Sequence, residues 1–162
     1  MAVGDVSSMS AVAAGNGKLA LKWYDPSATV VNDGVTLATW AKTTVVVKAG
    51  GYATDPDDAD AAYRLAVTTR NQYVSSPLTV TGLQNGVTYY VSFFPTSTDG
   101  AVNTGTANRV TGVPNRLAIS TVPSQSGSLT YSGNSQSPSW SNYDSSKMTL
   151  GGVTSGINAG SY

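Results

Sequence analysis

The stretch that decides the fold reads Lys18-Leu19-Ala20-Leu21-Lys22-Trp23. Leu19, Leu21 and Trp23 alternate with small or charged residues, and the side chains of a β-strand point alternately to opposite faces. The stretch therefore predicts a half-buried strand whose apolar face lies on a core. The pair Asp25-Pro26 ends the strand, because proline has no N–H group to donate to a central sheet.

Short segments of the same kind recur along the chain. We expect further strands, rich in Val, Thr and aromatic residues, at 6–13, 43–48, 63–67, 78–81, 87–94 and 104–113. The irregular pattern of the first of these indicates a bulge. Helix-favouring patterns are weak, because Glu is absent and Gly and Pro interrupt the chain. The sequence therefore predicts an antiparallel all-β fold, with two long connections at 26–42 and 50–71.

The composition excludes several classes of function. The 162 residues carry nine basic and nine acidic side chains, and they include no His and no Cys. Disulfides and thiolate sites are therefore absent, as are the commonest general base and transition-metal ligand. Zero net charge without a basic cluster argues against a nucleic-acid partner, and no apolar run is long enough to cross a membrane. We expect a structural or binding protein that is not an enzyme and needs no cofactor.

The amino-acid composition changes near residue 114, after which Ser becomes frequent. We place one domain at 1–113, a linker at 114–119 and a second, shorter β module at 120–162. Composition alone allows a disordered tail instead. Against a tail, Leu129 and Tyr131 alternate, and Trp140 and Tyr143 are expected to form the core of the second module.

One segment resembles a known family. It reads Leu78-Thr79-Val80-Thr81-Gly82-Leu83-Gln84-Asn85-Gly86-Val87-Thr88-Tyr89-Tyr90-Val91, and it is similar to the corner between two strands of a fibronectin type III domain. The resemblance implies an immunoglobulin-like β-sandwich for residues 1–113. It makes Leu83 the corner leucine and Tyr89 the corner tyrosine, whose hydroxyl would bond to the local backbone. Trp23 resembles the core tryptophan of the family.

A narrower resemblance concerns the version of this domain in tail and fibre proteins of bacteriophages. It is carried by the segments 33–40, 47–52, 70–73 and 94–100. The later segments 129–133, 138–140 and 158–162 are similar to a bacterial immunoglobulin-like repeat. That repeat has at least one more strand than this chain supplies, so the second module is expected to be incomplete. Either the chain is a fragment, or another polypeptide completes the sheet.

The resemblance implies a structural protein of a phage virion, such as a tail, baseplate, neck, fibre or decoration component. Its partners would be other virion proteins and copies of itself, with a host-surface glycan as a further candidate. The chain would be found in the virion, after assembly in the host cytoplasm. The alternative is a carbohydrate-binding or adhesion module of a bacterial surface or secreted protein, which would be extracellular.

The outward face of the strand at 87–94 is a candidate assembly surface. If Tyr89, Val91 and Phe93 point into the core, then Tyr90 and Phe94 point outward, with Val46 of a neighbouring strand beside them. Exposed aromatics of this kind suggest a contact surface. The alternative is that the connection at 26–42 folds back over them, with Trp40 as its anchor.

Loop residues supply two weaker candidates. Tyr and Trp stack well on sugar rings, and such residues lie on or near loops at Trp40, Tyr52, Tyr63 and Tyr73. The alternative is that each aromatic pins its own loop. The acidic run Asp55, Asp57, Asp58 and Asp60 offers oxygen ligands for calcium, but its spacing does not fit an EF-hand. A solvated loop with turn-forming Asp is the simpler explanation. We expect no catalytic residue.

Overall fold

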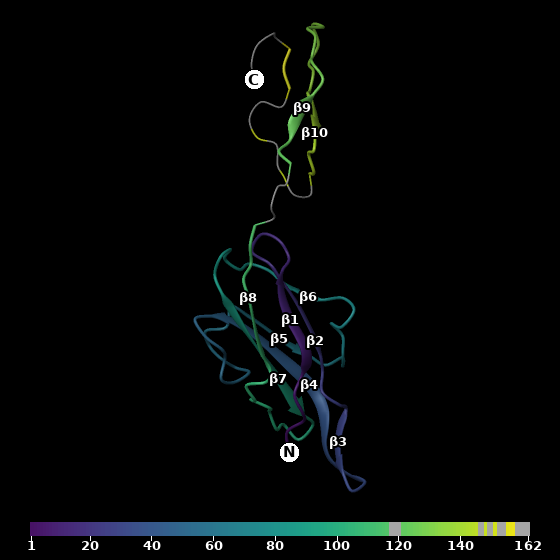
Figure 1. The fold of residues 1–162 in the computed structure, drawn as a ribbon, viewed down its shortest axis with the longest axis vertical. Coiled ribbons are helices and arrows are strands. Elements are labelled where there is room, and N and C mark those ends of the chain that lie inside the picture. The colour runs from purple at the N-terminus through teal and green to yellow at the C-terminus, as the bar shows by residue number, and fades with distance from the viewer. Residues whose placement is uncertain (117–120, 146–147, 149–150, 152–154, 158–162) are drawn as a thin grey trace. The chain divides into compact units, whose positions relative to one another are not determined.

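A computed structural model describes residues 1–116, 121–145, 148, 151 and 155–157 (Figure 1). The chain divides into two compact units, Met1–Arg116 and Leu117–Tyr162. The described residues form ten β-strands, every pair of which is antiparallel. Among them no helix is present that could span a membrane. The protein is therefore all-β, as its alternating segments predict.

The smaller sheet of the first unit has the strand order β1-β2-β6. Its strands are β1 (Ser7–Ala13), β2 (Leu19–Tyr24) and β6 (Leu78–Val80). The predicted bulge is present in β1, where the register shifts between Ser7 and Ser10 and Ser8 has a φ of 49°. The strand expected at 18–23 is β2, and its central position follows from pairing with strands on both sides.

The larger sheet is built around β4 (Val35–Ala49), a strand of 15 residues. The first part of β4 pairs with β3 (Thr29–Asn32), and the later part pairs with β5 (Tyr63–Val67). On its other side β4 pairs with β7 (Tyr89–Ser97), which in turn pairs with β8 (Arg109–Gly112). Because β4 is so long, it projects past the strands that surround its second half.

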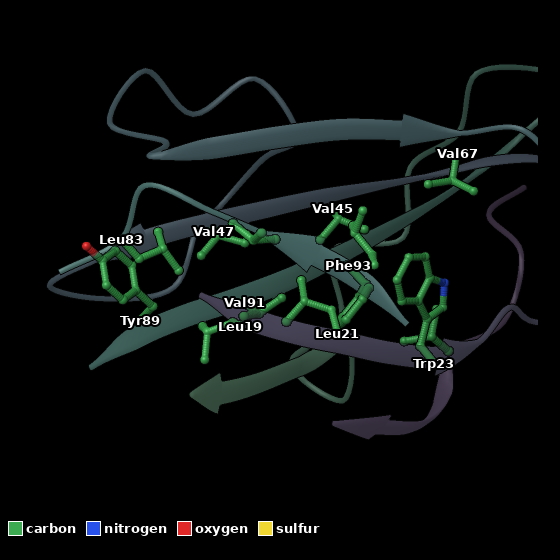
Figure 2. Close-up of a cluster of buried hydrophobic side chains, with 13 residues drawn as sticks. Leu19, Leu21, Trp23, Val45, Val47, Val67, Leu83, Tyr89, Val91 and Phe93 are labelled. Atoms are coloured by element: carbon green, nitrogen blue, oxygen red, sulfur yellow. The ribbon is translucent and has the colours of Figure 1, made fainter. Parts of the chain in front are cut away.

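The two sheets pack face to face through one hydrophobic cluster (Figure 2). Leu19, Leu21 and Trp23 come from β2, and residues of β4, β6 and β7 meet them from both sheets. Trp23 is almost fully buried, with its ring centroid 5.0 Å from that of Phe93. The first unit is therefore sandwich-like, and its core is the apolar face that the alternation in each strand predicts.

The corner before β7 has the expected local geometry. The backbone N–H of Gln84 donates to the Tyr89 hydroxyl oxygen at 3.1 Å, and both Leu83 and Tyr89 are buried. Gly17 lies against this corner, because the backbone N–H of Leu83 donates to its carbonyl oxygen at 3.0 Å. The corner thus ties the end of one sheet to the start of the other.

The segment at 26–42, predicted only as a long connection, is strand for most of its length. This segment forms β3 and the first part of β4, joined by a two-residue turn at Asp33 and Gly34, whose φ values are 48° and 78°. Asp-Gly tolerates this left-handed turn, and β-branched residues on either side favour strands. The hairpin extends from one end of the first unit (Figure 1). We call residues 29–39 the arm.

The second unit contains one short strand pair within its described residues. Strand β9 (Ser124–Ser126) pairs with β10 (Ser139–Ser141), and Gln136 forms an isolated bridge with Gly156. The prediction that Trp140 is core is wrong, because this residue, which lies in β10, is 39% exposed. Tyr143 is half-buried, and its hydroxyl donates to the carbonyl oxygen of Met148 at 3.3 Å. The predicted motif residues at 158–162 lie outside the described residues.

Candidate functional site

The outer face of the larger sheet does not form the open aromatic surface proposed from the sequence. Phe94 and Val46 do lie on that face, but they are buried in a second apolar cluster with Ala53. Ala53 belongs to the loop that follows β4, so this loop supplies the cover. The segment at 26–42, expected as the cover, forms the arm instead. Phe94 and Val46 therefore cannot reach a partner unless the loop moves.

Tyr52 and Tyr90 remain half-buried at the margin of this cover. Their rings meet edge to face, with centroids 4.9 Å apart and planes at 85°. The guanidinium carbon of Arg109 lies 5.1 Å from the centroid of Tyr52, a cation–π distance. One face of Tyr52 is thus occupied by Arg109, and its contact with Tyr90 holds the loop down. This arrangement pins the loop and leaves less of Tyr52 available for stacking on a sugar.

The other aromatics proposed for sugar contact are also engaged within the chain. Tyr73 packs on Trp23 with ring centroids 5.2 Å apart, so it extends the core. The indole N–H of Trp40 donates to the Thr43 hydroxyl at 3.0 Å. Tyr63 packs against the same core, and burial raises the pKa of its hydroxyl. These contacts correspond to the alternative in which each aromatic fixes its own loop.

The acidic run does not gather its carboxylates around one point. Both oxygens of Asp58 accept from the Lys48 ammonium, at 3.0 and 2.9 Å, while Asp55 accepts the backbone N–H of Asp57 at 2.8 Å. Among the described residues no group of three or more metal-binding side chains occurs that could hold an ion. The run forms turns and ion pairs with Lys48 and Arg64, and the loop it stabilises is the one that covers Phe94.

The ion pair shifts the pKa values of both partners. The hydrogen bond from Lys48 holds the pKa of the Asp58 carboxyl below its ordinary value of 3.8, and the bond to Asp58 raises the pKa of Lys48 above 10.5. Arg64 adds a hydrogen bond of 2.6 Å to the carbonyl oxygen of Asp58. Both groups therefore stay charged through the neutral range, which suits a structural tie and not a proton-transfer role.

A buried polar network escaped the sequence analysis. Asp25 is 5% exposed, and its Oδ1 accepts from the Trp23 indole N–H at 3.0 Å and from the Thr43 hydroxyl at 2.6 Å. Its Oδ2 accepts from the backbone N–H of Asn71 at 2.6 Å, and the Asn71 side chain accepts from the Asp25 N–H. The carboxylate joins β2, β4 and the connection after β5. With all its bonds made inside the chain, it has a structural role.

The arm carries the largest exposed apolar side chains of the larger sheet. Val35 is 60% and Leu37 is 42% exposed, and Val31 is exposed as well. Val35 and Leu37 lie close together on β4, where the register with β3 shifts between Val30 and Val31. Their signal in the sequence was available: Asp33-Gly34 between β-branched residues is typical of a hairpin turn. The sequence analysis predicts only a connection at 26–42, so Val35 and Leu37 were not predicted as exposed surface residues.

The outer face of the smaller sheet is also open. Because Leu19, Leu21 and Trp23 point into the core, Ala20, Lys22 and Tyr24 point away from it. The register places Val12 and Thr79 on either side of Ala20. Val12 is 60% exposed and Tyr24 is 41% exposed. We call this surface, made of Val12, Ala20, Lys22, Tyr24 and Thr79, the open face.

Comparison with known proteins does not identify a family for this chain. The chain matches no family model and no curated protein.

Proposed function

We propose that this chain is a non-enzymatic structural protein of a phage virion, which acts by contacting other subunits. The observation that carries the proposal is the arm. A two-stranded hairpin that projects with exposed Val31, Val35 and Leu37 leaves apolar area in water, and such area marks a docking surface when it is contiguous. Val12, Tyr24 and Val113 are also exposed in the first unit, but three exposed apolar residues gather in the one hairpin of the arm.

The strand arrangement supports the fibronectin-like part of the proposal. One sheet contains β1, β2 and β6, and the facing sheet contains β4, β5, β7 and β8. The hydroxyl of Tyr89 bonds to the backbone five residues earlier, as the corner tyrosine of such sandwiches does. The virion assignment itself rests on the sequence resemblance in the segments 33–40, 47–52, 70–73 and 94–100. A fold of this kind serves many functions, so the site must carry the argument.

The side chains that could do chemistry are engaged in structure. The carboxylates of Asp25 and Asp58 are both held by hydrogen bonds or an ion pair from their own chain. A general acid or base needs access to a substrate and a pKa near the working pH. Asp25 is buried away from any substrate, and the pKa of Asp58 is lowered, away from neutral pH; a contact function requires no such group.

The test is whether the chain occurs in particles and whether the arm is needed there. Particles purified from a lysed host culture are expected to contain the chain in a fixed copy number by quantitative mass spectrometry. A Val35→Thr/Leu37→Ser variant is expected to fold and accumulate in the lysate but to be depleted from particles. Val113→Thr, which changes an exposed valine outside the arm, is the matched control. A chain found only in the free lysate, or incorporated equally without the apolar arm, contradicts the proposal.

A further inference from the structure

The arm and the open face are both exposed on the same unit, so the arm does not cover the open face of its own chain. Each surface is therefore free to meet another molecule. Val35 and Leu37 provide exposed apolar area on the arm, and Val12 and Tyr24 provide it on the open face. Burying these residues against one another would remove both from water, which is favourable in proportion to the area buried.

Charge decides which surfaces can meet. Asp33, at the tip of the arm, is the single charged residue between 27 and 41. The open face carries Lys22, with Lys18 at the start of the same strand, and neither lysine forms an ion pair within the described residues. No carboxylate lies on this face. Two arms meeting tip to tip would bring two carboxylates together, and two open faces would bring lysines together. Only arm on face pairs opposite charges.

We propose that the arm of one copy docks on the open face of a second copy, with Asp33 near Lys22 and with Val35 and Leu37 against Val12 and Tyr24. This inference rests on the proposed assembly function and names its partner. The contact is heterologous, because it joins two different surfaces. A heterologous contact repeats from copy to copy and produces a ring or an open filament, according to whether the rotation closes.

The size of the two surfaces sets the expected affinity of the contact between two copies. The arm has eleven residues, fewer than the roughly 20 to 30 that each side of a stable interface contributes. A single contact is therefore weak. Copies held side by side in a particle would gain from effective concentration, so a weak contact is sufficient there. Self-association of the isolated chain has to be measured at high concentration.

The experiment is sedimentation velocity of the full chain over a concentration series that reaches about 1 mM. We expect the wild type to associate as concentration rises and to dissociate with added salt, which screens the charge pair. Lys22→Glu and Asp33→Lys are each expected to weaken association about tenfold. Mixed in equal amounts, the two variants should associate again, because the arm of each variant then meets an open face of opposite charge on the other variant. Arg116→Glu is the control, since Arg116 is exposed and outside both surfaces.

Circular dichroism and unfolding midpoints establish that each variant is folded. Because a lysine at the turn can disturb the arm, Leu37→Ser provides a second variant that leaves the turn intact, and it too should weaken association. The inference is overturned if the wild type is monomeric at every concentration, if both charge reversals associate normally, or if the mixture does not recover. A monomeric chain whose arm is still required in particles overturns this inference alone and leaves the proposed function standing. If the chain self-associates through its arm but is absent from particles, the proposed function is overturned and this inference stands.

Discussion

Replacing Asp25 by Asn tests the buried network that joins the two sheets. The carboxylate accepts three hydrogen bonds: from the indole of Trp23, the hydroxyl of Thr43 and the backbone N–H of Asn71. In Asp25→Asn the remaining oxygen still accepts two bonds, but they lose the assistance of the negative charge. The new amide N–H group faces the backbone N–H of Asn71, so that donor loses its partner.

The magnitude follows from these bonds. A hydrogen bond to a charged group contributes about 1.5 to 3 kcal/mol and a neutral one about 1, so each of the two retained bonds weakens by about 1 kcal/mol. The orphaned N–H of Asn71 costs a further 1 to 3 kcal/mol or so, and a neutral amide is cheaper to bury than a carboxylate. We expect a net loss of about 2 to 3 kcal/mol. For a unit of this size that lowers the melting temperature by roughly 10 °C.

The assay is urea unfolding followed by tryptophan fluorescence, with thermal unfolding as a second measure. Asp33→Asn makes the same chemical change at the exposed tip of the arm, and it should alter stability by less than about 0.5 kcal/mol. Combining Asp25→Asn with Thr43→Val should cost less than the sum of the single changes, since Asp25→Asn already weakens the bond that Thr43→Val removes. If Asp25→Asn unfolds at the wild-type urea concentration, the network does not stabilise the fold and the reasoning fails.

Two further predictions concern the corner and the loop. Gly17→Ala should destabilise the protein by about 2 to 4 kcal/mol in urea titrations, because Gly17 has a φ of 65° and an added Cβ would lie 2.5 Å from a backbone carbonyl oxygen. The control Gly50→Ala, with a φ of 81° and no atom within 4 Å, should cost only about 1 kcal/mol. Equal losses in the two variants would refute the crowding at Gly17. Asp58→Asn should lower the thermal midpoint near neutral pH, where the ion pair with Lys48 is intact. Because the pKa of Asp58 is lowered in the folded state, its contribution to stability is present above pH 3.8 and is lost as pH falls through the folded pKa. Because the pKa of Lys48 is raised, its contribution to stability is lost only above pH 10.5. The gap between wild type and variant should therefore close in strong acid, whereas a gap that persists there, or that also appears for the control Asp55→Asn, would contradict the assignment.

Local patterns were sufficient to predict most strands and their inward faces. Alternation along Leu19, Leu21 and Trp23 predicted the buried face of β2, and the same period in β7 predicted Val91 and Phe93 as core. These predictions succeed because a strand has a period of two whatever surrounds it. The bulge in β1 and the corner hydrogen bond of Tyr89 are likewise properties of short segments.

The surfaces could not be predicted in this way. The sequence correctly placed Phe94 opposite Phe93, but whether that outer face meets water depends on where the loop after β4 lies, and this loop covers it with Ala53. The bond between Asp25 and Asn71 joins residues 46 positions apart. Contacts over such separations depend on how the sheets pack, and no local period reports them.

The sequence by itself determined that the protein is all-β, which residues face the core of its first unit, and that cysteine and histidine chemistry is absent. The tertiary structure decided which outer residues are covered, which carboxylates are bound internally, and that the segment at 26–42 projects as an arm. The physical reason is that strand formation and side-chain alternation are set within a few residues, whereas exposure is set by whichever distant segment packs on top.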